Sequence, residues 1–314
     1  MTKLANNVDH QDVSIVNETA WLLGQPSLED FLDFVREQTA GGRNLARAAL
    51  VDEWRAANDY YYELEQSEAG IADEVEALDL DPSLKPLADK LIADDRYQRA
   101  FDAVPTRFAM IELDRLIVSQ SHVDITHCQR QSARLGPNAS AAQVLRFCQG
   151  MDREEAPFNV RKSGHNCYTF TSSSSDFRFH EARLFTPDQF SGDAAMRGNS
   201  SVLGLMVGYS SNFLSVIQSD SRIVLHNGHH RAYTLRALGY THAPCIVQTV
   251  TRRDELNLIA SKDVVRNPGH YFLAARPPLL KDFFDSKIRK IFHVPQITRT
   301  VELSFEVREF EAAH

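Results

Sequence analysis

Residues Ser221–Val250 read SRIVLHNGHHRAYTLRALGYTHAPCIVQTV, and this stretch indicates how the surrounding chain folds. The apolar run Ile223–Leu225 is typical of a buried strand. Asn227-Gly228 is a turn dipeptide, because glycine adopts backbone angles that other residues avoid. The pattern therefore predicts that the chain leaves a strand and reverses its direction at Gly228.

A helix and a second strand are predicted to follow this turn. Apolar residues recur at helical spacing between Arg231 and Leu238, and Gly239 is the residue type that commonly follows a helix end. The helix is short, about two turns. From Cys245 the apolar residues resume, so a second strand is expected there.

The side chains best suited to binding or catalysis stand at the junction of the turn and the helix. The first N–H groups of a helix have no internal partner and carry partial positive charge, which makes such an end a ready anion site. His229, His230 and Arg231 stand at this position. A guanidinium grips a phosphate or carboxylate through two parallel hydrogen bonds. The alternative is that three polar residues simply begin a surface helix.

The string NGHHRAYTLRALGY, followed by APCIV, resembles the signature of the ParB/sulfiredoxin-like fold, where a turn at a helix N-terminus holds nucleotide phosphates. Residues 111–124, IELDRLIVSQSHVD, are similar to that family's first strand and its polar loop. The resemblance implies an α+β fold with a mixed sheet and helices. It also implies a cofactor-binding role for Asn227, Gly228, His230 and Arg231.

The same resemblance brings the loop that contains His122 and Asp124 close to Gly228. An imidazole or a carboxylate held near a substrate hydroxyl can take its proton, so either residue is a candidate general base. The candidate catalytic residues are therefore His122, Asp124, His229 and His230. The alternative is structural: Asp124 caps the loop, and His122 has partners within the protein.

The implied activity is that of a phosphotransferase or nucleotide hydrolase acting on an anionic small molecule, with ATP, ADP or CTP and magnesium. Sulfiredoxins place a reactive cysteine where this chain has His229, so thiol repair is not expected. The free-serine kinases of this fold carry Asp where this chain has Asn227. The DNA-reading helix-turn-helix and basic surface of the DNA-segregation ParB proteins are not recognisable in the sequence.

Composition limits the class of protein and its partners. A hydrophobic fraction of 43% and a charged fraction of 24% are ordinary for a globular protein. Residues 1–105 hold 9 Lys and Arg against 22 Asp and Glu, a balance of −13, and residues 106–314 carry +5. The acidic part argues against nucleic acid, while the basic remainder suits a small anionic ligand; the alternative is that the uneven charge has no function.

The sequence also indicates the cellular compartment of the protein and the state of its cysteines. The start of the chain has no apolar segment behind a basic one, so no signal peptide is expected. The longest apolar stretch, Val202–Tyr209, is too short to cross a membrane. We therefore expect a cytoplasmic protein with no membrane partner, whose four cysteines are reduced and mostly buried.

Three segments are expected along the chain. Residues 1–104 form an acidic, all-α domain or cap that covers the rest or mediates homo-oligomerisation. Residues 105–270 form the ParB/sulfiredoxin-like domain, with a β-hairpin insertion around 155–220 whose turn is Ser172–Ser175. Residues 271–314 form a C-terminal extension that ends in a strand, because Val301–Val307 alternates apolar and polar residues.

Other functional classes stay open. An enzyme of specialised metabolism could use the same turn for a substrate carboxylate, or a histidine for a metal or haem. Adjacent histidines do not readily turn to one ion, and a single haem ligand leaves no firm mark in a sequence. The third class is a non-enzymatic sensor or scaffold.

Overall fold

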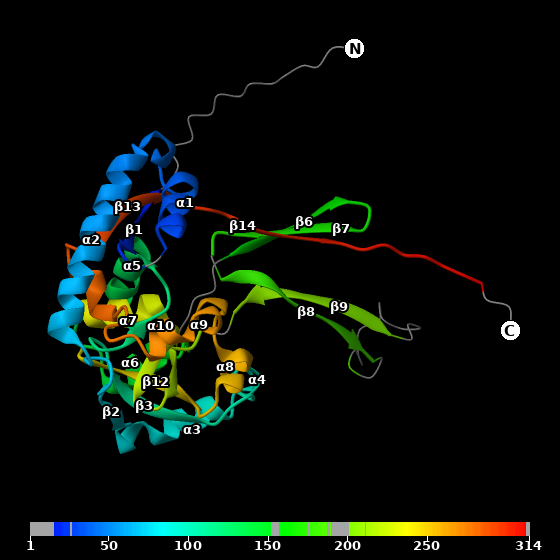
Figure 1. Cartoon of the computed structure of the whole chain (residues 1–314). Helices are drawn as coiled ribbons and strands as arrows, with labels where there is room; N and C mark the ends of the chain where they lie inside the picture. The colour runs from blue at the N-terminus through cyan, green and yellow to red at the C-terminus, as the bar shows by residue number, and fades with distance from the viewer. Residues whose placement is uncertain are drawn as a thin grey trace, which may run out of the picture. The chain divides into compact units, whose positions relative to one another are not determined.

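The computed structural model describes residues 16–25, 27–151, 157–174, 176–186, 189, 201–210 and 212–311. The chain divides into two compact units (Figure 1). Unit 1 consists of Met1–Asp152 with Asn212–Gln296, and unit 2 of Arg153–Ser211 with Ile297–His314. Both helices and several β-sheets are present, so the expected α+β class is confirmed.

The larger sheet of unit 1 has the strand order β2-β3-β12-β10-β11-β4. β10 is parallel to β12 and β11 is parallel to β4, whereas the other neighbours are antiparallel, so the sheet is mixed. The bounds are Ala77–Asp79 (β2), Thr106–Glu112 (β3), Ile117–Val118 (β4), Ser215–Ser219 (β10), Arg222–Asn227 (β11) and His242–Val250 (β12).

A smaller sheet in unit 1 has the order β13-β1-β5, with bounds Arg289–Pro295, Val16–Leu22 and His122–Asp124. The central strand β1 pairs antiparallel with both neighbours. The last four residues of VNETAWL are buried, which explains why this strand lies in the middle of the sheet.

The expectation of an all-α segment at residues 1–104 is therefore wrong, because both β1 and β2 belong to it. The divisions expected at residues 104 and 270 also lie inside unit 1. The physical reason is strand pairing: β1 and β2 pair with strands from distant parts of the chain, which ties the N-terminal helices to the rest of the unit.

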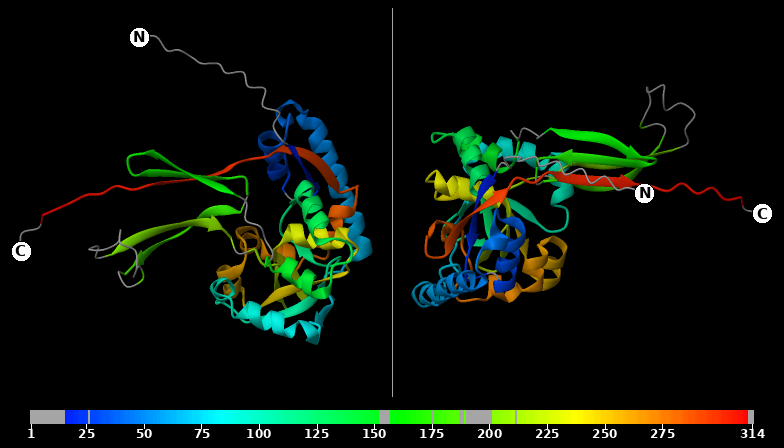
Figure 2. Two further views of the ribbon diagram at one scale, coloured as in Figure 1. Left: turned by 180° about the vertical axis from the view of Figure 1, so that it is seen from behind. Right: turned by 90° about the horizontal axis from the view of Figure 1, so that it is seen from above.

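The helices of unit 1 surround these sheets, and the longest described helix, α2, runs along one flank (Figure 2). The bounds are Leu28–Gln38 (α1), Gly42–Asn44 (η1), Arg47–Glu68 (α2), Pro82–Leu84 (η2), Lys85–Ile92 (α3), Asp95–Ala100 (α4), Ile125–Leu135 (α5), Ala141–Cys148 (α6), His229–Ala237 (α7), Arg253–Ile259 (α8), Lys262–Arg266 (α9), Pro268–Phe272 (α10) and Leu280–Phe284 (η5).

β11 is buried on both of its faces. Ile223 and Leu225 pack into the main core cluster of unit 1, while Val224 packs into a second cluster with Ile117. A strand covered on both sides is expected to read as a continuous apolar run, as this one does. The last two residues of β11, His226 and Asn227, are half-buried and lead into the turn at Gly228.

Unit 2 consists of β-strands. β14 (Arg299–Ser304), β7 (Cys167–Ser172) and β6 (Phe158–Gly164) form one sheet, and β8 (Phe177–Phe185) pairs with β9 (Val202–Tyr209). The strand expected over Val301–Val307 is present as Arg299–Ser304, so residues 305–307 lie beyond its end.

The hairpin in unit 2 differs from the expected one. β6 and β7 are joined at His165-Asn166, where Asn166 has a left-handed φ of 56°. β8 pairs with β9 rather than with β7, so Ser172–Ser175, of which Ser175 lies outside the described residues, is not the hairpin turn. Asparagine tolerates the left-handed conformation better than most residues, and this favours the turn at Asn166.

Candidate functional site

The turn between β11 and α7 requires glycine for two reasons. Gly228 has φ 90° and ψ 25°, in the left-handed region, and a Cβ atom there would lie 2.7 Å from Leu214 Cδ1. Asn227 Oδ1 accepts a hydrogen bond of 2.8 Å from the Gly228 amide. No side chain caps the start of α7, and the Arg231 amide donates to the Gly228 carbonyl at 2.9 Å, so the amides that a ligand could use are those of His229 and His230.

The polar loop before α5 lies against this turn. The Asp124 amide donates a hydrogen bond of 3.1 Å to His230 Nε2, which joins the end of β5 to the first turn of α7. Asp124 also caps α5, since its Oδ1 accepts from the His127 amide and its Oδ2 from Asn17 Nδ2, both at 2.8 Å. The structure thus brings His122, Asp124 and His230 into one neighbourhood.

His230 is neutral and structurally engaged. Because its Nε2 accepts a hydrogen bond, its proton lies on Nδ1. The His127 ring meets the His230 ring edge to face, with 5.2 Å between centroids. Burial, together with the nearby His127, His229 and His122, lowers the pKa of His230 to about 3. A neutral imidazole can donate or accept a hydrogen bond, but it contributes no positive charge to an anion site.

His229 and His226 have polar atoms without a protein partner. His229 is only 6% exposed, and neither its Nε2 nor His226 Nδ1 meets a hydrogen-bonding group among the described residues. Burial and the neighbouring His226 and His122 lower the pKa of His229 to about 3, and burial lowers the pKa of His226. A buried polar atom without a partner costs about 1–3 kcal/mol, so both nitrogens have hydrogen-bonding capacity that the described residues leave unused, as do other buried atoms such as Gln149 Oε1 and Gln248 Nε2.

His122 lies in an aromatic environment on β5. Its ring stacks on Trp21, with centroids 5.5 Å apart and planes within 4°, and also lies over Phe34. Burial lowers the pKa of His122, although the charge of Asp124 opposes this effect. His122 is therefore a neutral imidazole held in a fixed orientation; the lowered pKa makes it a weaker base, but its unprotonated form can accept a proton.

The Arg231 guanidinium is buried and bonded within the protein, whereas the sequence leads us to expect an exposed group that binds an anion. Its side chain is buried, with only 4% of the residue exposed. Nη1 donates to the carbonyl oxygens of Asn212 and of Cys148, the latter at 3.5 Å. Cys148 ends α6, where helix carbonyls carry partial negative charge. Arg231 thus holds α7 against the end of α6 and the segment before β10.

The turn is largely covered by neighbouring side chains. Gly228, His229 and Arg231 are buried, whereas Asn227 and His230 are half-buried. Access from solvent is therefore on the side of Asn227 and His230. His127 is a further residue of this site that the sequence did not lead us to expect, although its position one helical turn after Asp124 places it there.

Metal and thiol chemistry find little support in the described part of the chain. No group of three or more His, Cys, Asp or Glu side chains there is arranged to hold a metal ion. Cys128, Cys148 and Cys245 are buried free thiols, as expected, while Cys167 is half-buried. Burial raises the pKa of Cys128 and Cys148 to about 12, so neither thiol ionises readily.

Among the helices of the described residues, none combines the length and apolar character needed to span a membrane. Comparison of the chain with protein-family models, curated proteins and solved structures found no match.

Proposed function

We propose that this protein is a small-molecule enzyme of ParB/sulfiredoxin-like fold, which binds a nucleotide phosphate or another anionic group at the start of α7. Its reaction class is phosphate transfer or nucleotide hydrolysis. The observation that carries the proposal is the combination of an uncapped helix start with His229 Nε2 and His226 Nδ1, two buried nitrogens that lack a partner among the described residues. Phosphate oxygens would accept hydrogen bonds from all of these groups.

The proposed anion site uses dipoles rather than a direct cationic contact. Arg231 donates to backbone carbonyls, and His230 Nε2 accepts a hydrogen bond, so neither side chain grips the anion as the sequence suggests. The charge of Arg231 nevertheless contributes to the lowered pKa of His230, which means that its positive field reaches the turn. Such a field favours an anion without a direct contact.

His122 is the preferred general base in this proposal. It is neutral and oriented by stacking on Trp21, so it can accept a proton from a substrate hydroxyl. Asp124 is the alternative base. Both of its oxygens already accept one hydrogen bond, but a carboxylate has about four acceptor positions and retains capacity. The nucleotide would supply the phosphoryl group, with magnesium entering on its phosphates.

Calorimetric titration with ATP, ADP and CTP, each with and without magnesium, tests the proposal. We expect at least one nucleotide to bind, and His229→Asn to weaken that binding about tenfold through loss of one hydrogen bond in a buried site. His293→Asn is the matched control, because His293 is exposed on β13. Failure of all three nucleotides to bind would contradict the nucleotide version.

The same purified protein separates the alternative uses of this site. An absorption spectrum and elemental analysis detect a resident haem or metal, and titration with small carboxylates detects a carboxylate ligand. If carboxylates bind in a His229-dependent manner and nucleotides do not, the turn is an anion site, but phosphate transfer is excluded.

A further inference from the structure

A cavity of about 360 Å³ lies beside α2 in unit 1, and we call it the α2 cavity. Its size is within the range of small-molecule sites in proteins. The lining residues that matter here are Trp54, Tyr61, Tyr62 and Glu65 from α2, and His270 and Arg276 from the segment around α10.

The α2 residues reach the cavity because of helical spacing. Trp54, Tyr61 and Glu65 are seven and four residues apart, which places them on one face of the helix. Tyr61 is buried, whereas Tyr62 is 59% exposed, so the consecutive tyrosines play different roles. The cavity therefore has aromatic walls, and an acidic residue lies at the C-terminal end of the same helix face.

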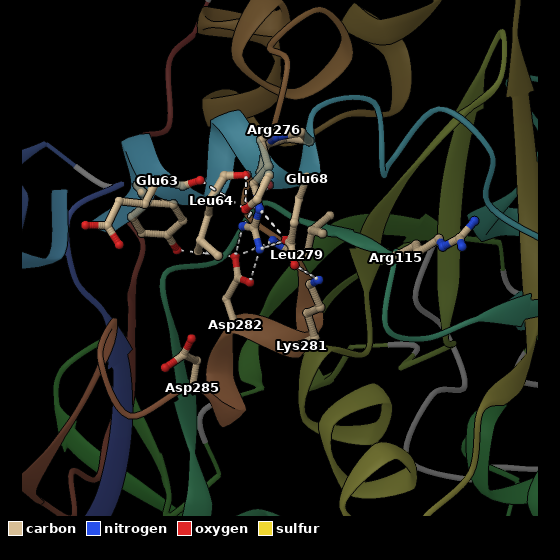
Figure 3. Close-up of polar contacts among 12 residues, drawn as sticks. Glu63, Leu64, Glu68, Arg115, Arg276, Leu279, Lys281, Asp282 and Asp285 are labelled. Carbon is tan, nitrogen blue, oxygen red and sulfur yellow. Dashed lines mark hydrogen bonds and ion pairs between the residues drawn. The ribbon is translucent and has the colours of Figure 1, made fainter. Parts of the chain in front are cut away.

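Arg276 cannot serve as an anion-binding group in this cavity. Its Nε donates to Glu68 at 3.2 Å, Nη1 donates to the Pro277 carbonyl and to Asp282, and Nη2 donates to Glu68 and Asp282 (Figure 3). A guanidinium has five N–H donors, so all of them are occupied. Burial alone would lower the pKa of Arg276, but Asp282 and Glu68 raise it, and the charge is retained.

The charge of Arg276 is also neutralised locally. Two carboxylates, Glu68 and Asp282, pair with it, and Lys281 Nζ lies 2.7 Å from Glu68 Oε1 (Figure 3). The formal charges of these two cations and two carboxylates sum to zero. Burial lowers the pKa of the remaining titratable base, His270, so it is uncharged at neutral pH. The net charge that faces the cavity is that of Glu65.

The part of the chain that contains α2 reinforces this negative charge. Residues 1–105 carry a balance of −13. An aromatic wall attracts a cation through the negative faces of its rings, and a nearby carboxylate adds to that attraction. An anionic ligand would meet no available donor on Arg276 and would be repelled by Glu65.

We infer that the α2 cavity binds a small organic cation, an ammonium group that carries apolar substituents. Trp54 and Tyr62 contact the cation and its substituents, and Glu65 supplies the counter-charge. This site is separate from the one at the start of α7 and does not depend on the proposed nucleotide chemistry.

Three probes of matched shape test the inference: choline, its neutral carbon analogue 3,3-dimethyl-1-butanol, and the anion 3,3-dimethylbutanoate. Binding to the full chain is measured by calorimetry or ligand-observed NMR. We expect choline to bind about tenfold more tightly than the neutral analogue, as a cation–π contact together with a carboxylate would give. The anion should not bind.

Two variants with the same net charge locate the effect. Glu65→Gln should weaken choline binding about fivefold. Glu63→Gln, an exposed position on the same helix that does not line the cavity, should change it less than twofold. Both substitutions are conservative and exposed, so loss of folding is not expected. Absence of choline binding, equal binding of the three probes, or equal effects of the two variants would overturn the inference.

Discussion

The guanidinium of Arg231 donates to the carbonyl oxygens of Asn212 and Cys148, and this contact determines what a substitution there should do. Lysine retains the charge, but its ammonium nitrogen lies one bond nearer the backbone than Nη1 and so does not reach the position from which Nη1 contacts both carbonyls. We expect Arg231→Lys to lower the free energy of unfolding by about 2–4 kcal/mol, because it leaves a buried charge poorly paired.

Urea unfolding followed by circular dichroism measures this effect. Arg55→Lys is the control, since Arg55 is an exposed residue of α2 whose side chain is 70% accessible; it should cost less than about 0.5 kcal/mol. Equal stabilities of the two variants would mean that Arg231 is not committed to the backbone.

The buried histidines should make the protein sensitive to acid. The pKa values of His229 and His230 are lowered to about 3, so the unfolded chain binds more protons than the folded one below about pH 6.5. Their contribution to stability is complete above the unfolded pKa and is lost as the pH falls toward 3. Each proton adds a slope of about 1.4 kcal/mol per pH unit.

His230→Gln tests this dependence, because the glutamine oxygen can still accept the hydrogen bond from the Asp124 amide while the titrating group is removed. The assay runs between about pH 6 and pH 4, which lies inside the interval between the folded pKa of about 3 and the unfolded pKa of about 6.5. Over this interval, the slope of unfolding free energy against pH should be smaller in the variant than in the unsubstituted protein by about one proton equivalent. His293→Gln, on the exposed side of β13, should leave the slope unchanged. An unchanged slope in His230→Gln would mean that His230 does not titrate in this way.

For single residues, the sequence predicts which side chains lie together, but not which hydrogen bonds their atoms make. The grouping of His122, Asp124 and His230 follows from the turn signal and the resemblance, and the Asp124–His230 hydrogen bond agrees with it. The burial of Arg231 was not predictable, since its partners are backbone carbonyls supplied by α6 and residue 212. Carbonyls carry no sequence signal.

The turn that begins α7 places a strict demand on Gly228. Its left-handed φ of 90° strains any L-residue, and an added Cβ would lie 2.7 Å from Leu214 Cδ1 and 3.0 Å from Leu214 Cα. We expect Gly228→Ala to destabilise the protein by about 1–2 kcal/mol of backbone strain, with a further 1–3 kcal/mol of overpacking.

Gly239 offers a matched control. It has the same φ of 90°, but an added Cβ there meets no atom within 4 Å. Gly239→Ala should therefore cost the backbone strain alone, and the difference between the two variants in thermal unfolding isolates the contact with Leu214. If the two substitutions are equally costly, the turn does not pack tightly against Leu214 in solution.

Elements with a clear local signal were predictable from the sequence, and those that depend on distant partners were not. β11, the turn and α7 lie where the apolar run, the Asn-Gly pair and the helical spacing place them. β1 has a polar start, and only its pairing with β13 and β5 makes it a strand. The hairpin of β6 and β7 turns at Asn166, because asparagine tolerates the left-handed conformation. The serine-rich segment Ser172–Ser175 is a stronger turn signal in the sequence, so the sequence predicts the turn there.

Unit 1 is built from both halves of the chain, which has a consequence for its folding. β1 pairs with β13 and β5, and Glu68 of α2 pairs with Arg276 and Lys281. A protein shortened to residues 105–314 loses these partners and uncovers core residues. We expect it to be insoluble or to lack cooperative thermal unfolding, because buried apolar surface and buried charges are exposed together.

A protein shortened to residues 1–296 is the matched control. It retains all of unit 1 and loses only the part of unit 2 that contains β14. This version should keep a cooperative unfolding transition. Cooperative folding of residues 105–314 alone would support a separable N-terminal cap, as the helical pattern of the sequence suggests.

The claim on which the proposed function depends is that the start of α7 holds a ligand through its free amides and neutral imidazoles. The most direct measurement is a nitrogen-15 NMR titration of the whole protein with ATP and magnesium, observing the His229 and His230 amides and the imidazole nitrogens of His226 and His229. We predict that these signals shift together and saturate, while those of His293 do not move. Saturable binding that leaves the α7 signals unchanged would place the nucleotide elsewhere, and the absence of any shift would contradict nucleotide binding by this protein.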